Sequence, residues 1–121
     1  MSIQRRIASF RYAFQGLGDL FRSQANARIH LAAVAVVVAA GLYFKVEPME
    51  WVALTLCMCG VIAMEALNTA IEYLTDLVSP GRHPLAGKAK DVAAAAVLVM
   101  AFGAVIVAAI IFGPRVIALV F

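Results

Sequence analysis

The chain has 121 residues, of which 64% are apolar, and its formal net charge at pH 7 is +3. Soluble domains are about 45–50% apolar, so this composition excludes an ordinary water-soluble globule and indicates an integral membrane protein. The ten Lys and Arg residues are spread along the chain instead of forming one patch. Their distribution argues against nucleic acid as a partner and favours anionic lipid or nucleotide phosphate.

Residues 1–24 are predicted to form an amphipathic helix that lies on the membrane surface. Apolar side chains recur at steps of three and four residues, the spacing of one helical face, and the arginines fall mainly elsewhere. Such a helix suits the membrane interface. The alternative, a helix packed on protein, has little soluble protein to pack on. The apolar face consists of Ile3, Ile7, Phe10, Phe14, Leu17 and Phe21.

Three membrane spans are predicted to follow this helix. The first ends near the turn signal Lys45-Val46-Glu47-Pro48, and the second begins with an aromatic anchor, Trp51. The second span breaks at Ser79-Pro80-Gly81, and Gly113-Pro114-Arg115 stops the third. The chain, residues 1–121, is therefore expected to be one all-α, membrane-embedded domain. The spans cover residues 27–45, 50–78 and 89–112.

The distribution of Lys and Arg predicts which ends of the spans face the cytoplasm. With three spans, the N-terminal segment and the 77–91 loop lie on one side and hold eight of the ten basic residues. The other side holds only Lys45 and Arg115. Because cytoplasmic segments are enriched in Lys and Arg, the N-terminus and the 77–91 loop are expected to be cytoplasmic.

An acidic stripe is predicted on the second span near its cytoplasmic end. At about 100° per residue, Glu65, Glu72 and Asp76 fall within about 40° of one another, with Asn68 and Thr69 beside them. Glu65 is expected at the depth of the lipid head groups. An ionised carboxylate in hydrocarbon costs several kcal/mol, so the stripe needs cations, metal or water opposite it. A functional site is favoured over a purely structural network with basic side chains.

The segment from Gly81 to Asp91 brings basic groups next to this stripe. It differs from a phosphate-binding P-loop in the spacing of its glycines and in the residue after the lysine. Two lysines, an arginine and the start of the third helix nevertheless suit a phosphate. Together with carboxylates that suit Mg²⁺, these groups indicate phosphoryl transfer to a membrane lipid.

Motifs along most of the chain resemble one known family. They are Phe10-Arg11-Tyr12-Ala13-Phe14-Gln15-Gly16-Leu17, Asn26-Ala27-Arg28-Ile29-His30, Glu65-Ala66-Leu67-Asn68-Thr69-Ala70-Ile71-Glu72, Asp76 and His83-Pro84-Leu85-Ala86-Gly87-Lys88-Ala89-Lys90-Asp91. With them the chain resembles the prokaryotic integral-membrane diacylglycerol kinases, the undecaprenol kinase branch most closely. The resemblance implies a homotrimer in the bacterial inner (cytoplasmic) membrane, with active sites between neighbouring subunits.

The resemblance also implies a role for each matching residue. Glu65 matches the catalytic base that accepts the proton of the lipid hydroxyl as the γ-phosphate of ATP is attacked. Glu72 matches a ligand of the Mg²⁺ that accompanies ATP. Asn68 matches a polar residue lining the site, and Arg28 is expected near the lipid or the phosphates. The positions that match the ATP-binding site are Arg5, Tyr12, Glu72, His83, Lys90 and Asp91.

Gln24 departs from the family pattern, which commonly has a second metal-binding glutamate at this position. An amide oxygen can ligate Mg²⁺, but it brings no charge. The metal affinity, or the number of metal ions bound, is therefore expected to be lower than in relatives that carry an acid there.

The sequence thus predicts an ATP-dependent lipid kinase that phosphorylates the hydroxyl of a membrane lipid alcohol. Undecaprenol is the first choice and diacylglycerol the second. Two alternatives stay open at this point. One is a non-catalytic membrane subunit, in which the acidic stripe lines a cation path or belongs to a scaffold. The other is an inactive relative that binds nucleotide without turnover.

Overall fold

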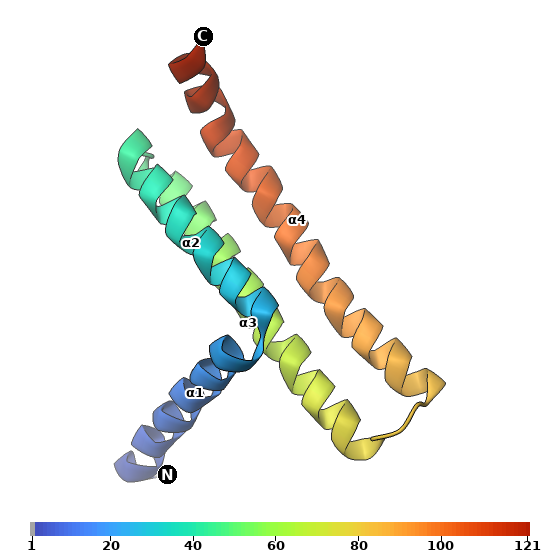
Figure 1. Ribbon diagram of the computed structural model, residues 1–121. Coiled ribbons are helices and arrows are strands. Elements are labelled where there is room, and N and C mark those ends of the chain that lie inside the picture. The colour runs from blue at the N-terminus through green and yellow to red at the C-terminus, as the bar shows by residue number, and fades with distance from the viewer. Residues whose placement is uncertain (1) are drawn as a thin grey trace.

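The computed structural model describes residues 2–121, which fold into four α-helices joined by short connections (Figure 1). In Figure 1, α2, α3 and α4 run lengthwise along the molecule, whereas α1 diverges from them at a sharp bend. The all-α architecture predicted from the sequence is confirmed. Met1, the first residue of the predicted surface helix, lies outside the described residues. The helices are α1 (Ile3–Ser23), α2 (Ala25–Phe44), α3 (Pro48–Val78) and α4 (Pro84–Val120).

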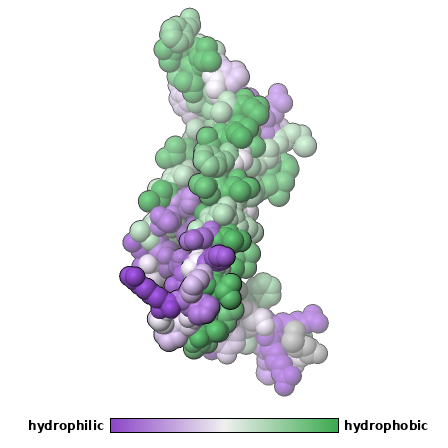
Figure 2. Space-filling model, turned by 90° about the vertical axis from the view of Figure 1, so that its right-hand side faces the viewer, coloured by the Kyte–Doolittle hydropathy of each residue, from purple (hydrophilic) through white to green (hydrophobic). Residues whose placement is uncertain are grey.

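The helices α2, α3 and α4 are each long and apolar enough to cross a membrane. Many of their large apolar side chains are exposed in the single chain, where they are available to lipid or to other helices. Figure 2 shows apolar residues over the middle and upper parts of the molecule and hydrophilic residues gathered towards its lower end. The three predicted spans are therefore confirmed as helices of spanning length.

The beginning of α4 differs from the sequence prediction. The helix starts at Pro84, about five residues earlier than the predicted span, because proline is tolerated at the first helical position, where no N–H is needed. The His83 side chain caps this end by accepting a hydrogen bond of 3.1 Å from the Leu85 N–H. Lys88 and Lys90 consequently lie on a helix, and the connection between α3 and α4 comprises only residues 79–83.

The predicted stop at Gly113-Pro114-Arg115 is wrong, because α4 continues through Pro114 to Val120. A proline within a helix removes one backbone hydrogen bond, but other contacts hold this turn in place. The Arg115 guanidinium donates to the Ile111 carbonyl oxygen at 2.6 Å and to both carboxylate oxygens of Glu50 on α3, at 2.7 and 2.8 Å. This ion pair ties α4 to the beginning of α3.

A small core lies at the same end of the molecule, where α2 turns into α3. Val46, Leu54 and Ile111 are its buried residues, and the half-buried Trp51 packs against them. A Cβ atom built on Gly41 would lie 2.4 Å from Cη2 of Trp51. The indole ring therefore occupies the space that any side chain at position 41 would need.

Gly41→Ala is expected to lower the free energy of unfolding by about 1–3 kcal/mol, since overpacking forces the indole ring out of its site. Resistance of the purified protein to unfolding by SDS measures the effect. Gly16→Ala is the matched control, because nothing lies within 4 Å of a Cβ atom there and alanine favours a helix. Equal destabilisation by both substitutions would contradict close packing at Gly41.

Hydrogen bonds between side chains attach the surface helix α1 to α3. The Tyr73 hydroxyl donates to Oδ2 of Asp19 at 2.7 Å and lies 3.2 Å from the Ser23 hydroxyl. All three groups are exposed. The last turn of α1 is therefore attached to α3 at the residue that directly follows Glu72.

Tyr73→Phe is expected to loosen this attachment, because it removes the hydroxyl and keeps the ring. A hydrogen bond contributes about 0.5–1.5 kcal/mol net, which corresponds to about a 2- to 10-fold increase in the open population. Trypsin cleavage after Arg22, next to the bend, measures the opening. Tyr43→Phe provides the control, because Tyr43 is also exposed but lies on α2. Equal cleavage rates in the two variants would contradict the attachment of α1 to α3.

Candidate functional site

Glu65 is the most unusual residue of the acidic stripe. Its side chain is only 2% exposed, and its Oε2 atom has no hydrogen-bond partner within residues 2–121. Nε2 of His30 on α2 lies 3.8 Å from this oxygen. One turn along α3, Thr69 is also buried, with an unpartnered hydroxyl. Buried polar groups normally have hydrogen-bond partners, so these atoms indicate a candidate site for a ligand or for a reaction.

Glu65 lines a groove of about 240 Å³, called here the polar groove because four of its eight lining residues are polar. Asn26 and His30 line it from α2, and Glu65 and Asn68 line it from α3. The amide of Asn68 approaches Oε1 of Glu72 at 3.5 Å, whereas its own carbonyl oxygen is buried without a partner. The wall contributed by α4 is apolar and consists of Ala94, Val97, Leu98 and Ala101.

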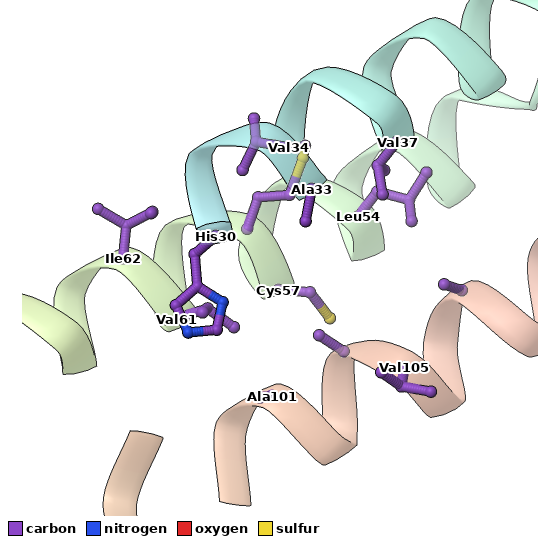
Figure 3. A pocket seen from close by; sticks show the side chains of 13 residues that line it. His30, Ala33, Val34, Val37, Leu54, Cys57, Val61, Ile62, Ala101 and Val105 are labelled. Atoms are coloured by element: carbon purple, nitrogen blue, oxygen red, sulfur yellow. The ribbon is translucent and has the colours of Figure 1, made fainter. Parts of the chain in front are cut away.

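An apolar groove of about 230 Å³ adjoins this polar groove and runs further along α2, α3 and α4 (Figure 3). His30 and Ala101 line both grooves, so the two meet at these residues. In Figure 3 the His30 side chain projects from α2 towards the space between α3 and α4. An apolar groove that adjoins a groove with a buried carboxylate suits a molecule with a polar head and an apolar tail.

A third hollow, of about 680 Å³, lies at the end of the helices beside the 79–83 connection. Asp76 from α3 and Lys90 from α4 line it and form an ion pair of 2.5 Å. Arg82 and His83 add further donors to its lining. The basic segment therefore lies beside the acidic stripe, an arrangement that suits an anionic ligand.

The predicted residues of the N-terminal half are less closely gathered. Arg5 and Tyr12 are exposed on α1, and neither lines one of the three hollows. Arg28 donates to two backbone carbonyl oxygens at the end of α1, at 3.1 and 2.9 Å. Within one chain it satisfies helix-end groups, and it lines none of the three hollows. It thereby fixes the bend between α1 and α2.

Gln24 is the one extended residue at this bend. Its neighbour Ser23 lies 3.2 Å from the Tyr73 hydroxyl, and Tyr73 directly follows Glu72. The bend therefore faces the turn of α3 that carries Glu72. Within residues 2–121, no three side chains of His, Cys, Asp or Glu gather into a metal site. Mg²⁺ bound to nucleotide phosphates needs only one or two protein carboxylates, and Glu72 is a carboxylate on this turn of α3.

At the other end of the site, the predicted residues have different surroundings. The side chain of Asp91 is exposed on α4, next to the half-buried Lys90. The His83 ring caps α4 and lines the hollow beside Asp76. The structure thus brings His83 and Lys90 together around one hollow, and it leaves Asp91 outside its lining.

His30 is the site residue that sequence reasoning missed. The segment Asn26–His30 matched a family pattern, but no role followed for a lone histidine at the start of an apolar span. Only the pairing of α2 with α3 brings it to Glu65, 35 positions along the chain. An unpaired histidine at such a position is the only signal the sequence offers.

Comparison with known proteins gives consistent matches. Residues 11–112 match the family described as prokaryotic diacylglycerol kinase. The chain is 37% identical over 113 residues to the undecaprenol kinase of Bacillus subtilis, a match that covers 93% of this chain and 92% of that protein. It is 44% identical over 115 residues to a diacylglycerol kinase of Synechocystis, covering 93% of this chain and 65% of that relative. The diacylglycerol kinase of Escherichia coli K12 is 33% identical over 102 residues, with 84% of each chain covered.

Proposed function

Since this chain belongs to the prokaryotic diacylglycerol kinase family, we propose that it transfers the γ-phosphate of Mg-ATP to the hydroxyl of a membrane lipid alcohol. One observation carries the proposal: the buried carboxylate of Glu65, whose Oε2 atom has no hydrogen-bond partner within residues 2–121, lines the polar groove next to His30, where that groove meets the apolar one. A lipid whose chain follows the apolar groove presents its hydroxyl to this carboxylate.

Undecaprenol is the proposed substrate, with diacylglycerol second. The relative named undecaprenol kinase matches over nearly its whole length, whereas the match to the Synechocystis relative leaves a third of that protein uncovered. Both alcohols present a hydroxyl at the depth of the lipid head groups. The apolar lining of the groove does not distinguish between the two chains, so a direct comparison of the two substrates decides between them.

Glu65 acts as the general base in this proposal. The hydroxyl O–H bond breaks and its proton passes to the carboxylate, while the oxygen forms a bond to the γ-phosphorus and ADP departs. The apolar wall of α4 would limit the access of water to the reacting oxygen once a lipid is bound. The lipid hydroxyl is thereby favoured over water as the acceptor.

The nucleotide is proposed to bind at the hollow beside the 79–83 connection. Lys90 supplies positive charge to the phosphates there, and Glu72 with Gln24 would hold the Mg²⁺, which neutralises charge on the phosphate oxygens when bound. Arg5 and Tyr12 line none of the hollows of their own chain. The homotrimer that the family resemblance implies is proposed here, and an α1 that serves a neighbouring subunit would account for these two residues. The remaining proposed nucleotide contacts are His83 and Asp91.

The protein is proposed to lie in the bacterial inner membrane, with the N-terminus and the 79–83 connection in the cytoplasm. The excess of basic residues at this end supports the orientation. It places the nucleotide hollow where ATP is available. Arg28, at the bend beside Gln24, is proposed to lie near the lipid head group while it fixes α1.

Transfer of labelled γ-phosphate from Mg-ATP tests the proposal. The purified protein in mixed micelles is offered undecaprenol and diacylglycerol separately, and Glu65→Ala is the control. Phosphorylated lipid from the intact chain and none from the variant is the expected result. Nucleotide binding without product would point to the inactive relative. Neither binding nor product would point to a non-catalytic membrane subunit.

A further inference from the structure

His30 occupies the junction of the two grooves. Its side chain is 23% exposed, and its Nε2 atom lies 3.8 Å from Oε2 of Glu65. This oxygen is fully buried and has no hydrogen-bond partner within residues 2–121. The imidazole therefore brings a hydrogen-bond donor close to an oxygen that needs one.

Several of the other residues around Glu65 do not offer this contact. No Lys or Arg from the described part of the chain lines the polar groove. The amide nitrogen of Asn68 is directed towards Glu72, at 3.5 Å. The side chains that α4 contributes are apolar and donate no hydrogen bond. His30 thus combines proximity with a donor that can be neutral or charged.

We propose that His30 is a positioning residue that orients the Glu65 carboxylate for proton transfer. The imidazole donates its Nε2–H to Oε2, and Oε1 is left to accept the proton of the substrate hydroxyl. This inference rests on the proposed role of Glu65 as the base. Closing the gap from 3.8 Å to a hydrogen bond of about 2.7–3.2 Å requires only a small side-chain movement. Catalytic hydrogen bonds commonly tighten in this way when the substrate binds.

A neutral donor suits this task better than a cation. A fixed positive charge beside Glu65 would stabilise the ionised carboxylate and weaken it as a base. A hydrogen bond from a neutral N–H group fixes the orientation of the carboxylate and leaves it a stronger base than a cation would. The position at the junction also places the imidazole beside the path along which a lipid hydroxyl reaches Glu65.

Two substitutions separate hydrogen-bond donation from bulk. His30→Leu keeps a side chain of similar size and removes the donor, and His30→Gln places an amide N–H at a similar reach. His30→Leu is expected to lower kcat by about 10- to 100-fold, because displacement of a catalytic group by about 1 Å has effects of that size. The KM for Mg-ATP is expected to stay within about 2-fold, since His30 does not line the nucleotide hollow. His30→Gln is expected to recover most of the loss.

A double-substitution cycle with Glu65→Gln provides the decisive measurement. If His30 acts through Glu65, His30→Leu lowers the residual rate of the Glu65→Gln protein by less than 2-fold, and the two effects are not additive. A purely structural role would lower the rate equally in both backgrounds and would overturn the inference. So would an active His30→Leu protein with an unchanged kcat. An intact chain without lipid kinase activity would instead overturn the proposed function, and this inference with it.

Discussion

Replacing Glu65 by Gln is expected to lower the rate of phosphoryl transfer by about 10²- to 10⁴-fold, the contribution typical of a general base. The substitution keeps the size and shape of a side chain that is only 2% exposed, and it removes the ability to accept the hydroxyl proton. Single-turnover transfer of γ-phosphate to the lipid measures the loss. Nucleotide binding is expected to be retained, because Glu65 does not line the hollow beside Asp76.

Glu50→Gln is the matched control for this prediction. It changes another glutamate of α3 in the same way, but at the far end of the helix, where Glu50 pairs with Arg115. Lower stability with a nearly normal turnover rate is the expected outcome for the control. A Glu65→Gln protein that transfers phosphate at the intact rate would refute the role of Glu65 as the base. A change in ion conduction without any effect of ATP would favour the cation-path alternative.

Replacing Glu72 by Gln is expected to raise the Mg²⁺ concentration that gives half-maximal activity by at least about 10-fold. Loss of an outer-shell partner alone lowers metal affinity by about 10- to 100-fold, and Glu72 is proposed to contact the metal directly. Gln24→Glu is expected to have the opposite effect, because it adds a second carboxylate at the bend beside the turn that carries Glu72.

Titration of activity with Mg²⁺ at saturating ATP measures both effects. Glu47→Gln serves as the control, because Glu47 caps the beginning of α3 at the far end of the molecule. Its Mg²⁺ requirement is expected to match that of the intact chain. An unchanged requirement in the Glu72→Gln protein would exclude Glu72 as a metal ligand. An unchanged requirement in the Gln24→Glu protein would exclude position 24.

The features that sequence reasoning predicted are those governed by local chemistry. Amphipathic spacing predicted α1, and long apolar runs predicted the three spans. Turn-forming residues at 45–48 and 79–81 predicted the connections between the spans. The helix end predicted at Pro114 was wrong, because Arg115 is held by Glu50, 65 positions away. No pattern within a single segment contains a contact of that kind.

In the candidate site, too, local patterns were predictable from the sequence and long-range contacts were not. The stripe of Glu65, Asn68 and Glu72 follows from helical spacing and matches a family motif. The degree to which each residue is buried does not follow from spacing, because it depends on how α2 and α4 pack on α3. The pairing of Asp76 with Lys90 matches the alternative in which basic residues form a structural network with the stripe. Within residues 2–121 no Lys or Arg pairs with Glu65, and its position beside His30 emerges only from the assembled fold.

The ion pair between Arg115 and Glu50 attaches one end of α4 to α3. From Arg115 to Ala94, beside Glu65, the helix runs 21 residues, or about 32 Å at 1.5 Å per residue. A tilt of about 2° around the tied end would therefore move the apolar wall of the polar groove by about 1 Å. The thickness of the surrounding bilayer acts on the tilt of membrane helices. A change in bilayer thickness that tilts α4 would therefore move the apolar wall of the polar groove.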